Sequence, residues 1–178
     1  MKLTETRLRG LYVVETFLKS DTRGKLCKAY NEDSFHKGGV FPEFKEFLYT
    51  VTEPGVIRGM HFQSPPFEQD KLVFVIKGSV VDVVVDLRKD SDSYGEYFDI
   101  ELSDRDGRAL YVPKGFAHGF KSLGEENIVG YLITCVFSEK HDGGIRWDSF
   151  GYDWNCISPI LSDKDKNLGP LEEFDSPF

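Results

Sequence analysis

Residues 72–86 read LVFVIKGSVVDVVVD, and this stretch decides the class of fold. Two runs rich in β-branched and aromatic residues, 72–76 and 80–86, are separated by a turn signal at Lys77-Gly78. Runs of this length and composition between turns are typical of β-strands. A longer run of the same kind covers 128–137. Many short strands at close spacing predict a mainly β domain, either a sandwich or a barrel.

Helices are expected to be short and peripheral, because few stretches keep a helical period for three turns. The segment 158–165 carries a serine or aspartate capping signal before a short charged run, which predicts one helical turn near the C-terminus.

The length of 178 residues favours a single domain spanning 1–178. A net charge of −8 argues against a nucleic-acid partner, since such binding requires lysine and arginine to neutralise phosphates. No apolar run approaches the roughly 20 residues needed to cross a membrane, and the N-terminus has no apolar signal segment. The cysteines Cys27, Cys135 and Cys156 are odd in number and far apart, which predicts neither disulfides nor a cysteine zinc site. We therefore expect a reduced cytoplasmic protein without a membrane partner.

Two spaced patterns of glycine and histidine occupy the middle of the chain. In the first, five residues separate Gly55 from His61, and six residues separate Lys71 from Gly78. In the second, five residues separate Gly107 from a Pro-Lys-Gly turn at 113–115, and two residues separate that turn from His118. Together they resemble the two signature motifs of the cupin superfamily. That resemblance implies a double-stranded β-helix, or jelly-roll cupin barrel, with short peripheral helices.

The residues at the cupin ligand positions bear on metal binding. In metal-binding cupins the first motif supplies two histidines and a glutamate, and the second supplies one histidine. Here His61 and His118 occupy two of those positions, while Gln63 replaces the second histidine and Lys71 replaces the glutamate. An ammonium group has no lone pair and repels a cation, whereas divalent metals prefer imidazole, thiolate or carboxylate ligands. We therefore expect no metal and no other cofactor, and a metal-dependent cupin oxygenase becomes the disfavoured alternative.

Longer motifs resemble a narrower family, the dTDP-4-dehydrorhamnose 3,5-epimerases, and the resemblance runs from about residue 10 to 170. The matching segments are 58–63 (RGMHFQ), 69–75 (QDKLVFV), 82–88 (DVVVDLR), 112–120 (VPKGFAHGF), 144–148 (GIRWD) and 161–165 (LSDKD). Several motifs in a fixed order are far more specific than any one of them.

The resemblance implies a metal-independent epimerase that acts as a homodimer on a nucleotide-linked 4-keto-6-deoxyhexose, in deoxysugar or surface-polysaccharide biosynthesis. It would invert the carbon on one or both sides of the ketone by removing and returning a proton. By position, His61 is the base, and Asp165 matches the carboxylate that orients it. Lys71 is placed to stabilise the enolate oxygen. Asp82 and Asp86 are expected to be buried strand carboxylates without a catalytic role.

The resemblance also indicates substrate-binding residues. Arg58, Gln63 and His118 would hold the pyrophosphate or the sugar, and Arg23 would reach the nucleotide of a neighbouring subunit. Lys28 stands where the family has a glutamate that contacts the nucleotide. The run EFLYT at 46–50 stands where the family has Gln-x-Asn-x-Ser. These departures leave the nucleotide base open.

The general acid is the main departure from the family pattern. Counting back from the GIRWD motif without a gap places the family's acid tyrosine at Phe137, which cannot donate a proton. If the run 128–137 is one strand, alternation gives Tyr131 and Cys135 the same face as Phe137, and either of them, or water, could substitute as the acid. Loss of the donor also predicts that one carbon is inverted rather than two. The alternative function is a sugar-nucleotide-binding cupin that has no activity or catalyses a different reaction.

Overall fold

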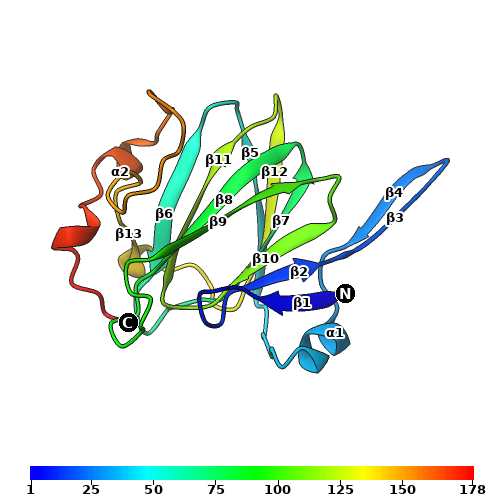
Figure 1. The fold of residues 1–178 in the computed structure, drawn as a ribbon, viewed down its shortest axis with the longest axis horizontal. Coiled ribbons are helices and arrows are strands. Elements are labelled where there is room, and N and C mark those ends of the chain that lie inside the picture. Colours follow the sequence, from blue (N-terminus) through cyan, green and yellow to red (C-terminus); the bar gives the residue numbers. More distant parts are fainter.

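The computed structural model describes residues 1–178 as two facing antiparallel sheets with a hairpin that projects from one side (Figure 1). The first sheet has six strands, in the order β1 (Lys2–Glu5), β2 (Tyr12–Glu15), β10 (Arg108–Val112), β7 (Lys71–Lys77), β12 (Asn127–Ile133) and β5 (Glu46–Thr52). The second has five, in the order β13 (Asp142–Gly144), β6 (Ile57–Gln63), β11 (Phe116–Ser122), β8 (Ser79–Asp86) and β9 (Tyr97–Ser103). This arrangement confirms the predicted jelly-roll barrel.

The remaining elements are short and lie outside the barrel. They are the projecting hairpin β3 (Phe17–Asp21) and β4 (Gly24–Lys28), the helices α1 (Glu32–Lys37) and α2 (Asp163–Lys166), and the 3-10 turns η1 (Glu139–His141) and η2 (Leu171–Glu173). Helix α2 falls at the end of the predicted 158–165 signal, and its cap is Ser162, whose hydroxyl accepts a hydrogen bond from the Asp165 amide. None of the helices is long and apolar enough to cross a membrane.

The core between the sheets follows from strand alternation, which sends every second side chain to one face. Strand β8 directs Val80 and Val84 into the barrel, where they join the inward residues of β7, β11 and β12. Its other face packs Val83 and Val85 against the C-terminal segment. Burial on both faces explains why this strand reads as a nearly unbroken apolar run. The aspartate at position 82 belongs to the inward set.

Strand β12 is shorter than the sequence predicted. It ends at Ile133. The Thr134 amide still donates to the Asp70 carbonyl, but the Asp70 amide donates to the Thr134 hydroxyl, at 2.8 Å, rather than to a backbone carbonyl, and the ladder stops there. Residues 134–138 therefore form a loop. The expectation that Phe137 continues the strand and shares the face of Tyr131 is wrong.

Strands β6 and β11 approach each other closely beside two histidines. His61 and His118 are directly paired across these strands, and the register shifts between His118 and Phe120. A Cβ atom on Gly59 would lie 2.6 Å from the Cα atom of Gly119, and Gly59 also has a φ of +144°. Side chains rarely adopt that backbone conformation. Glycine at both positions lets the two strands that carry the histidines approach this closely.

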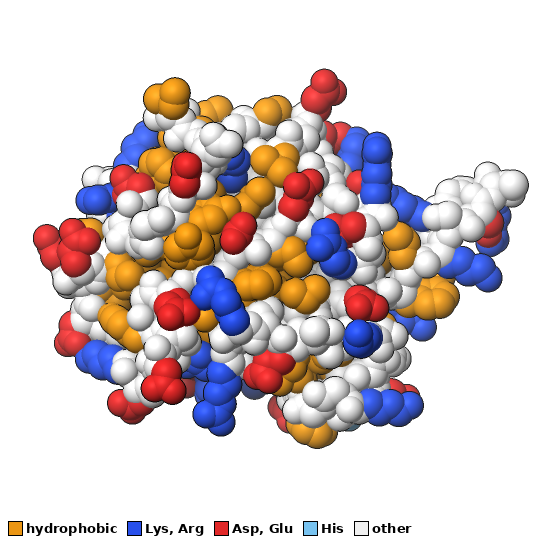
Figure 2. Space-filling model, in the orientation of Figure 1, with side chains coloured by type: hydrophobic (Ala, Val, Ile, Leu, Met, Phe, Trp, Pro, Cys, Tyr) orange, Lys and Arg blue, Asp and Glu red, His pale blue; other side chains and the backbone are white.

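The surface mixes charges. Figure 2 shows acidic and basic side chains interspersed, with apolar atoms between them, over the face seen in Figure 1.

Candidate functional site

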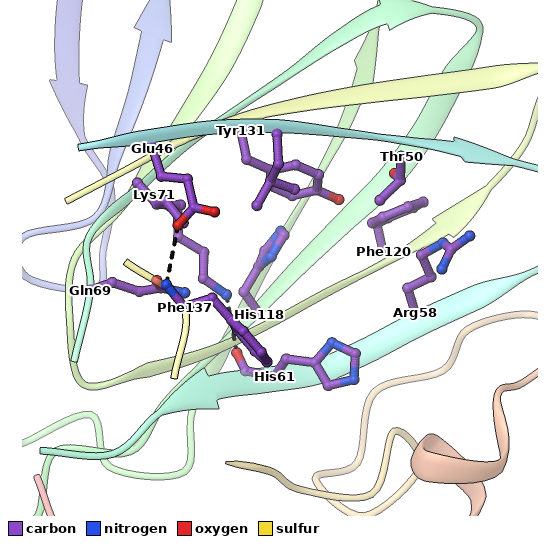
Figure 3. A pocket seen from close by; sticks show the side chains of 12 residues that line it. Glu46, Thr50, Arg58, His61, Gln69, Lys71, His118, Phe120, Tyr131 and Phe137 are labelled. Carbon is purple, nitrogen blue, oxygen red and sulfur yellow. Dashed lines mark hydrogen bonds between the residues drawn. The ribbon is translucent and has the colours of Figure 1, made fainter. Parts of the chain in front are cut away.

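A cavity of about 410 Å³ opens between the two sheets, and five strands and two loops line it (Figure 3). Its wall on the six-stranded sheet comes from β5, β7 and β12, and its wall on the five-stranded sheet from β6 and β11. The polar side chains central to its chemistry are Arg58, His61, Lys71, His118 and Tyr131. All five were named from the sequence, and the structure brings them together.

His61 and Asp165 form the pair that the sequence predicted. Nε2 of His61 lies 2.6 Å from Oδ1 of Asp165, whose other oxygen accepts from the Gly59 amide. The imidazole is 31% exposed and the carboxylate only 3%. Burial alone would raise the pKa of Asp165, but the hydrogen bonds from His61 and Gly59 hold it below the usual value. The ionised carboxylate therefore accepts a hydrogen bond from the Nε2–H group and leaves the lone pair on Nδ1 of His61 free to act as a base.

Lys71 begins β7 with its side chain buried in the cavity. Its ammonium donates to the carbonyl oxygen of His61 at 3.4 Å. Burial lowers the pKa of Lys71 to about 8, while the negative charges of Asp82 and Asp142 oppose the shift. The site thus holds a cation next to the backbone of the candidate base.

A second histidine pair lies deeper. Nε2 of His118 lies 2.9 and 3.0 Å from the two carboxylate oxygens of Asp82, and the two side chains are 4% and 0% exposed. The His118 ring also packs edge-on against Tyr131, with centroids 6.1 Å apart. The sequence analysis expected Asp82 to have a purely structural role. Its position between the inward Val80 and Val84 was the signal that placed it in the barrel.

Tyr131 projects into the cavity from the centre of β12. Burial, with the charge of Asp82 acting in the same direction, raises its pKa above the ordinary value for tyrosine, so the phenol keeps its proton. Phe137 instead lies in the loop after β12 and is 59% exposed, at the edge of the cavity, where its amide donates to Glu46. Cys135 does not line the cavity. Of these three candidates for the acid, only Tyr131 combines a donor with a place inside.

The expected substrate-binding residues divide into two groups. Arg58 and His118 line the cavity, and Nε of Arg58 donates a hydrogen bond to the Thr52 hydroxyl at 3.0 Å. Gln63 does not line it, and its expected binding role stays a prediction. Its amide nitrogen donates to the Phe67 carbonyl and its oxygen accepts from the Ser138 amide, which uses the side chain to fix the loops beside the cavity.

Arg23 and Lys28 lie on the projecting β3–β4 hairpin, and neither lines the cavity of its own chain. Arg23 is exposed and pairs with Asp21. Within one chain, therefore, the structure does not bring these two residues to the site.

Several residues of the cavity wall had no binding role predicted from the sequence. Glu46, Leu48 and Thr50 alternate along β5 and all face the cavity. They are every second residue of the EFLYT run, so strand alternation could have placed them. Gln69 also lines the cavity, two residues before Lys71.

Comparison with known proteins agrees with this geometry. The family described as dTDP-4-dehydrorhamnose 3,5-epimerase matches residues 5–173. The chain belongs to this family. The dTDP-4-dehydrorhamnose 3,5-epimerase of Methanothermobacter thermautotrophicus is 40% identical over 177 residues, which cover 97% of this chain and 95% of that enzyme. The relationship therefore extends over nearly the whole chain.

Solved structures of family members superpose closely. The Bacillus anthracis epimerase with TDP and PPi bound has a TM-score of 0.92 at 40% identity, covering 96% of this chain and 99% of that one. The Legionella pneumophila epimerase in complex with dTDP-4-keto-L-rhamnose has a TM-score of 0.92 at 29% identity, and the match covers 98% of this chain and 94% of that one. The family predicted from the ordered motifs is confirmed.

Proposed function

We propose that this protein epimerises a dTDP-linked 4-keto-6-deoxyhexose at one or both carbons beside the ketone, in deoxysugar or surface-polysaccharide biosynthesis in the cytoplasm. One observation carries the proposal: an oriented imidazole, His61, and a protonated phenol, Tyr131, come from opposite sheets and line one cavity (Figure 3). Inversion at carbon requires a base on one face and an acid on the other, and this arrangement supplies both.

The reaction follows from the positions of the groups. Nδ1 of His61 takes the proton from the carbon next to the ketone, and the C–H electron pair becomes the enolate, whose negative charge develops on the ketone oxygen. The Lys71 ammonium stabilises that oxygen. The Tyr131 hydroxyl returns a proton to the opposite face of the carbon, and the ketone re-forms with inverted configuration. Solvent then takes the proton from His61 and restores the one on Tyr131.

The assignment of Tyr131 replaces Phe137 as the position of the acid. The 3'-monoepimerase of Streptomyces bikiniensis has been solved in a form with one histidine and one tyrosine replaced, and these two have the same spacing as His61 and Tyr131. That relative is 25% identical with a TM-score of 0.88. The spacing supports Tyr131 as the acid, and it removes the reason for preferring a binding protein without catalytic activity.

We also propose that the enzyme is a homodimer in which the β3–β4 hairpin brings Arg23 and Lys28 to the partner's cavity. Two features support this arrangement. The hairpin extends away from its own barrel (Figure 1). The outer face of the edge strand β5 exposes Phe47, Tyr49 and Val51, an apolar row that a second copy would bury. In each cavity Arg58 would hold the pyrophosphate, as its charge and position suggest.

The test is proton exchange followed by NMR in deuterated solvent, with dTDP-4-keto-6-deoxyglucose as substrate. The expected result is deuterium at a carbon beside the ketone together with inversion of that carbon. Deuterium measured separately at each of the two carbons beside the ketone shows whether one or both are inverted. The absence of any incorporation, with dTDP still bound, would favour a sugar-nucleotide-binding cupin instead.

A further inference from the structure

Asp82 is a buried carboxylate with a single hydrogen-bonding partner. It lies on β8 between Val80 and Val84 and is fully buried inside the barrel. Both of its oxygens contact one donor, Nε2 of His118, at 2.9 and 3.0 Å. No arginine or lysine forms an ion pair with it, in contrast to Asp86 on the same strand, which pairs with Arg88. Burial of a carboxylate without an arginine or lysine partner costs free energy, so the presence of Asp82 beneath the cavity calls for an explanation.

The groups around Asp82 are those that line the cavity. His118 reaches it from β11, Lys71 approaches from β7 and Tyr131 from β12, while Arg58 on β6 lies near Tyr131. Of these, His118 alone makes a hydrogen bond to the carboxylate. That bond requires a proton on Nε2, and it therefore fixes both the tautomer and the orientation of the His118 ring. The other atoms of the ring face the cavity and Tyr131.

We propose that Asp82 is a positioning residue for substrate binding, which locks His118 as its Nε2–H form so that the remainder of the ring meets the sugar nucleotide in one orientation. This inference rests on the proposed function. A carboxylate can only accept from Nε2, whereas an amide at the same place could also donate to it. Asp82→Asn would therefore permit the other tautomer and the flipped ring.

The kinetic test compares Asp82→Asn with Asp86→Asn. Because His118 is assigned to binding, Asp82→Asn should raise KM about tenfold, the size of effect typical for a hydrogen bond to a charged group, and lower kcat by less. Asp86→Asn is the matched control. It removes an equally buried carboxylate from the same strand, but one whose partners, Arg88, Ser91 and Ser93, lie outside the cavity. It should leave KM unchanged.

A double-mutant cycle separates positioning from general loss of structure. In a His118→Asn background, Asp82→Asn should add nothing further to KM, because the residue through which it acts is gone. An additive increase would overturn the proposal. So would an Asp82→Asn enzyme whose KM stays within twofold of wild type, or one in which kcat alone falls.

A spectroscopic measurement on the wild-type protein needs neither turnover nor a folded variant. Long-range ¹H–¹⁵N NMR of the His118 imidazole should show a proton on Nε2, with and without bound dTDP. An Nε2 without a proton would overturn the proposal. Failure of the exchange experiment with dTDP-4-keto-6-deoxyglucose, by contrast, would reject the proposed epimerase activity and leave this measurement standing.

Discussion

The two histidine–aspartate pairs of the cavity use the same contact in different surroundings. His61 and His118 are paired directly across β6 and β11, and each presents Nε2 to a carboxylate. The partner of His61 comes from the short helix α2, outside the barrel, and the imidazole stays partly exposed. The partner of His118 comes from the neighbouring strand β8, and the whole pair is buried.

The difference in solvent exposure of the two imidazoles suits the two pairs to different roles. An imidazole that reaches the cavity with one free nitrogen can remove a proton from a substrate and later release it to solvent. A buried imidazole cannot release a proton directly to solvent, but it can keep a fixed orientation at little cost in conformational entropy. One pair is suited to chemistry and the other to recognition.

The largest expected effect separates the pairs directly. His61→Asn should lower proton exchange at the carbon beside the ketone by about 10²–10⁴-fold, because it removes the base. His118→Asn should mainly raise KM. Deuterium incorporation and dTDP affinity, measured for both variants, check this contrast. Comparable loss of exchange in the two variants would mean that both histidines take part in the chemistry.

Replacing Tyr131 tests the acid that lies against the buried pair. Tyr131→Phe should lower net inversion about 10²-fold while some deuterium still enters, because His61 can remove a proton and return one to the same face. Chiral analysis of the product together with deuterium content measures both. If inversion in the variant stays near the wild-type rate, the acid is another group or water.

Asp165→Asn should affect kcat rather than KM, the opposite of Asp82→Asn. The amide still fills the space but no longer favours the Nε2–H form of His61, and we expect kcat to fall about 10-fold or more. Steady-state kinetics of the two variants side by side provide the measurement. Because Asp165 has a lowered pKa, its ionised form also stabilises the fold above the unfolded value near 3.9. That contribution is lost as the pH falls below this value, and the variant should lack it.

Lys71 lies between the two pairs and should set the alkaline limit. If its proton is needed, kcat/KM should fall by about tenfold per pH unit above pH 8, the value to which burial lowers the pKa of Lys71. Lys71→Arg should move this fall to higher pH, because arginine stays charged. The lowered pKa also means that the unfolded chain binds this proton more tightly, so stability should rise between about pH 8 and the unfolded value near 10.4. A pH profile unchanged in Lys71→Arg would show that another group sets the limit.

The smallest effect is expected at the cavity edge. Phe137→Tyr adds a hydroxyl outside both histidine pairs, so the ratio of exchange at the two carbons should change by less than twofold. The same NMR assay measures it. A clear rise in the second exchange would restore the expectation that this position carries the acid.

The sequence was informative wherever a residue's role depended on a local motif. The ordered motifs predicted the barrel, and His61, Lys71 and His118 all meet in the cavity. Asp165 was placed beside His61 although 104 residues separate them. In each case a strand or a helix cap fixes the direction of the side chain, and the period of that element can be read from the chain.

Roles that depend on distant contacts were predicted poorly. Strand β12 ends where the Thr134 hydroxyl accepts the hydrogen bond from the amide of Asp70, 64 residues away, and nothing near Thr134 signals this. Phe137, the position found by counting back from the GIRWD motif without a gap, therefore lies in a loop rather than on β12. Gln63 stands at a cupin metal-ligand position, but its side chain is hydrogen-bonded to the loops beside the cavity. The proposed role of Arg23 depends on a second chain, which a single sequence does not describe.

The glycine contact between β6 and β11 has a consequence for inherited variation. At Gly59 and Gly119 any side chain would meet backbone atoms of the opposite strand, within 3.0 Å in each direction. A missense change at either codon would force apart the strands that carry both histidines. Cells with such an allele should contain little of the protein rather than a normal amount of inactive enzyme. Genetic screens that score activity alone would misassign these two positions to the catalytic machinery.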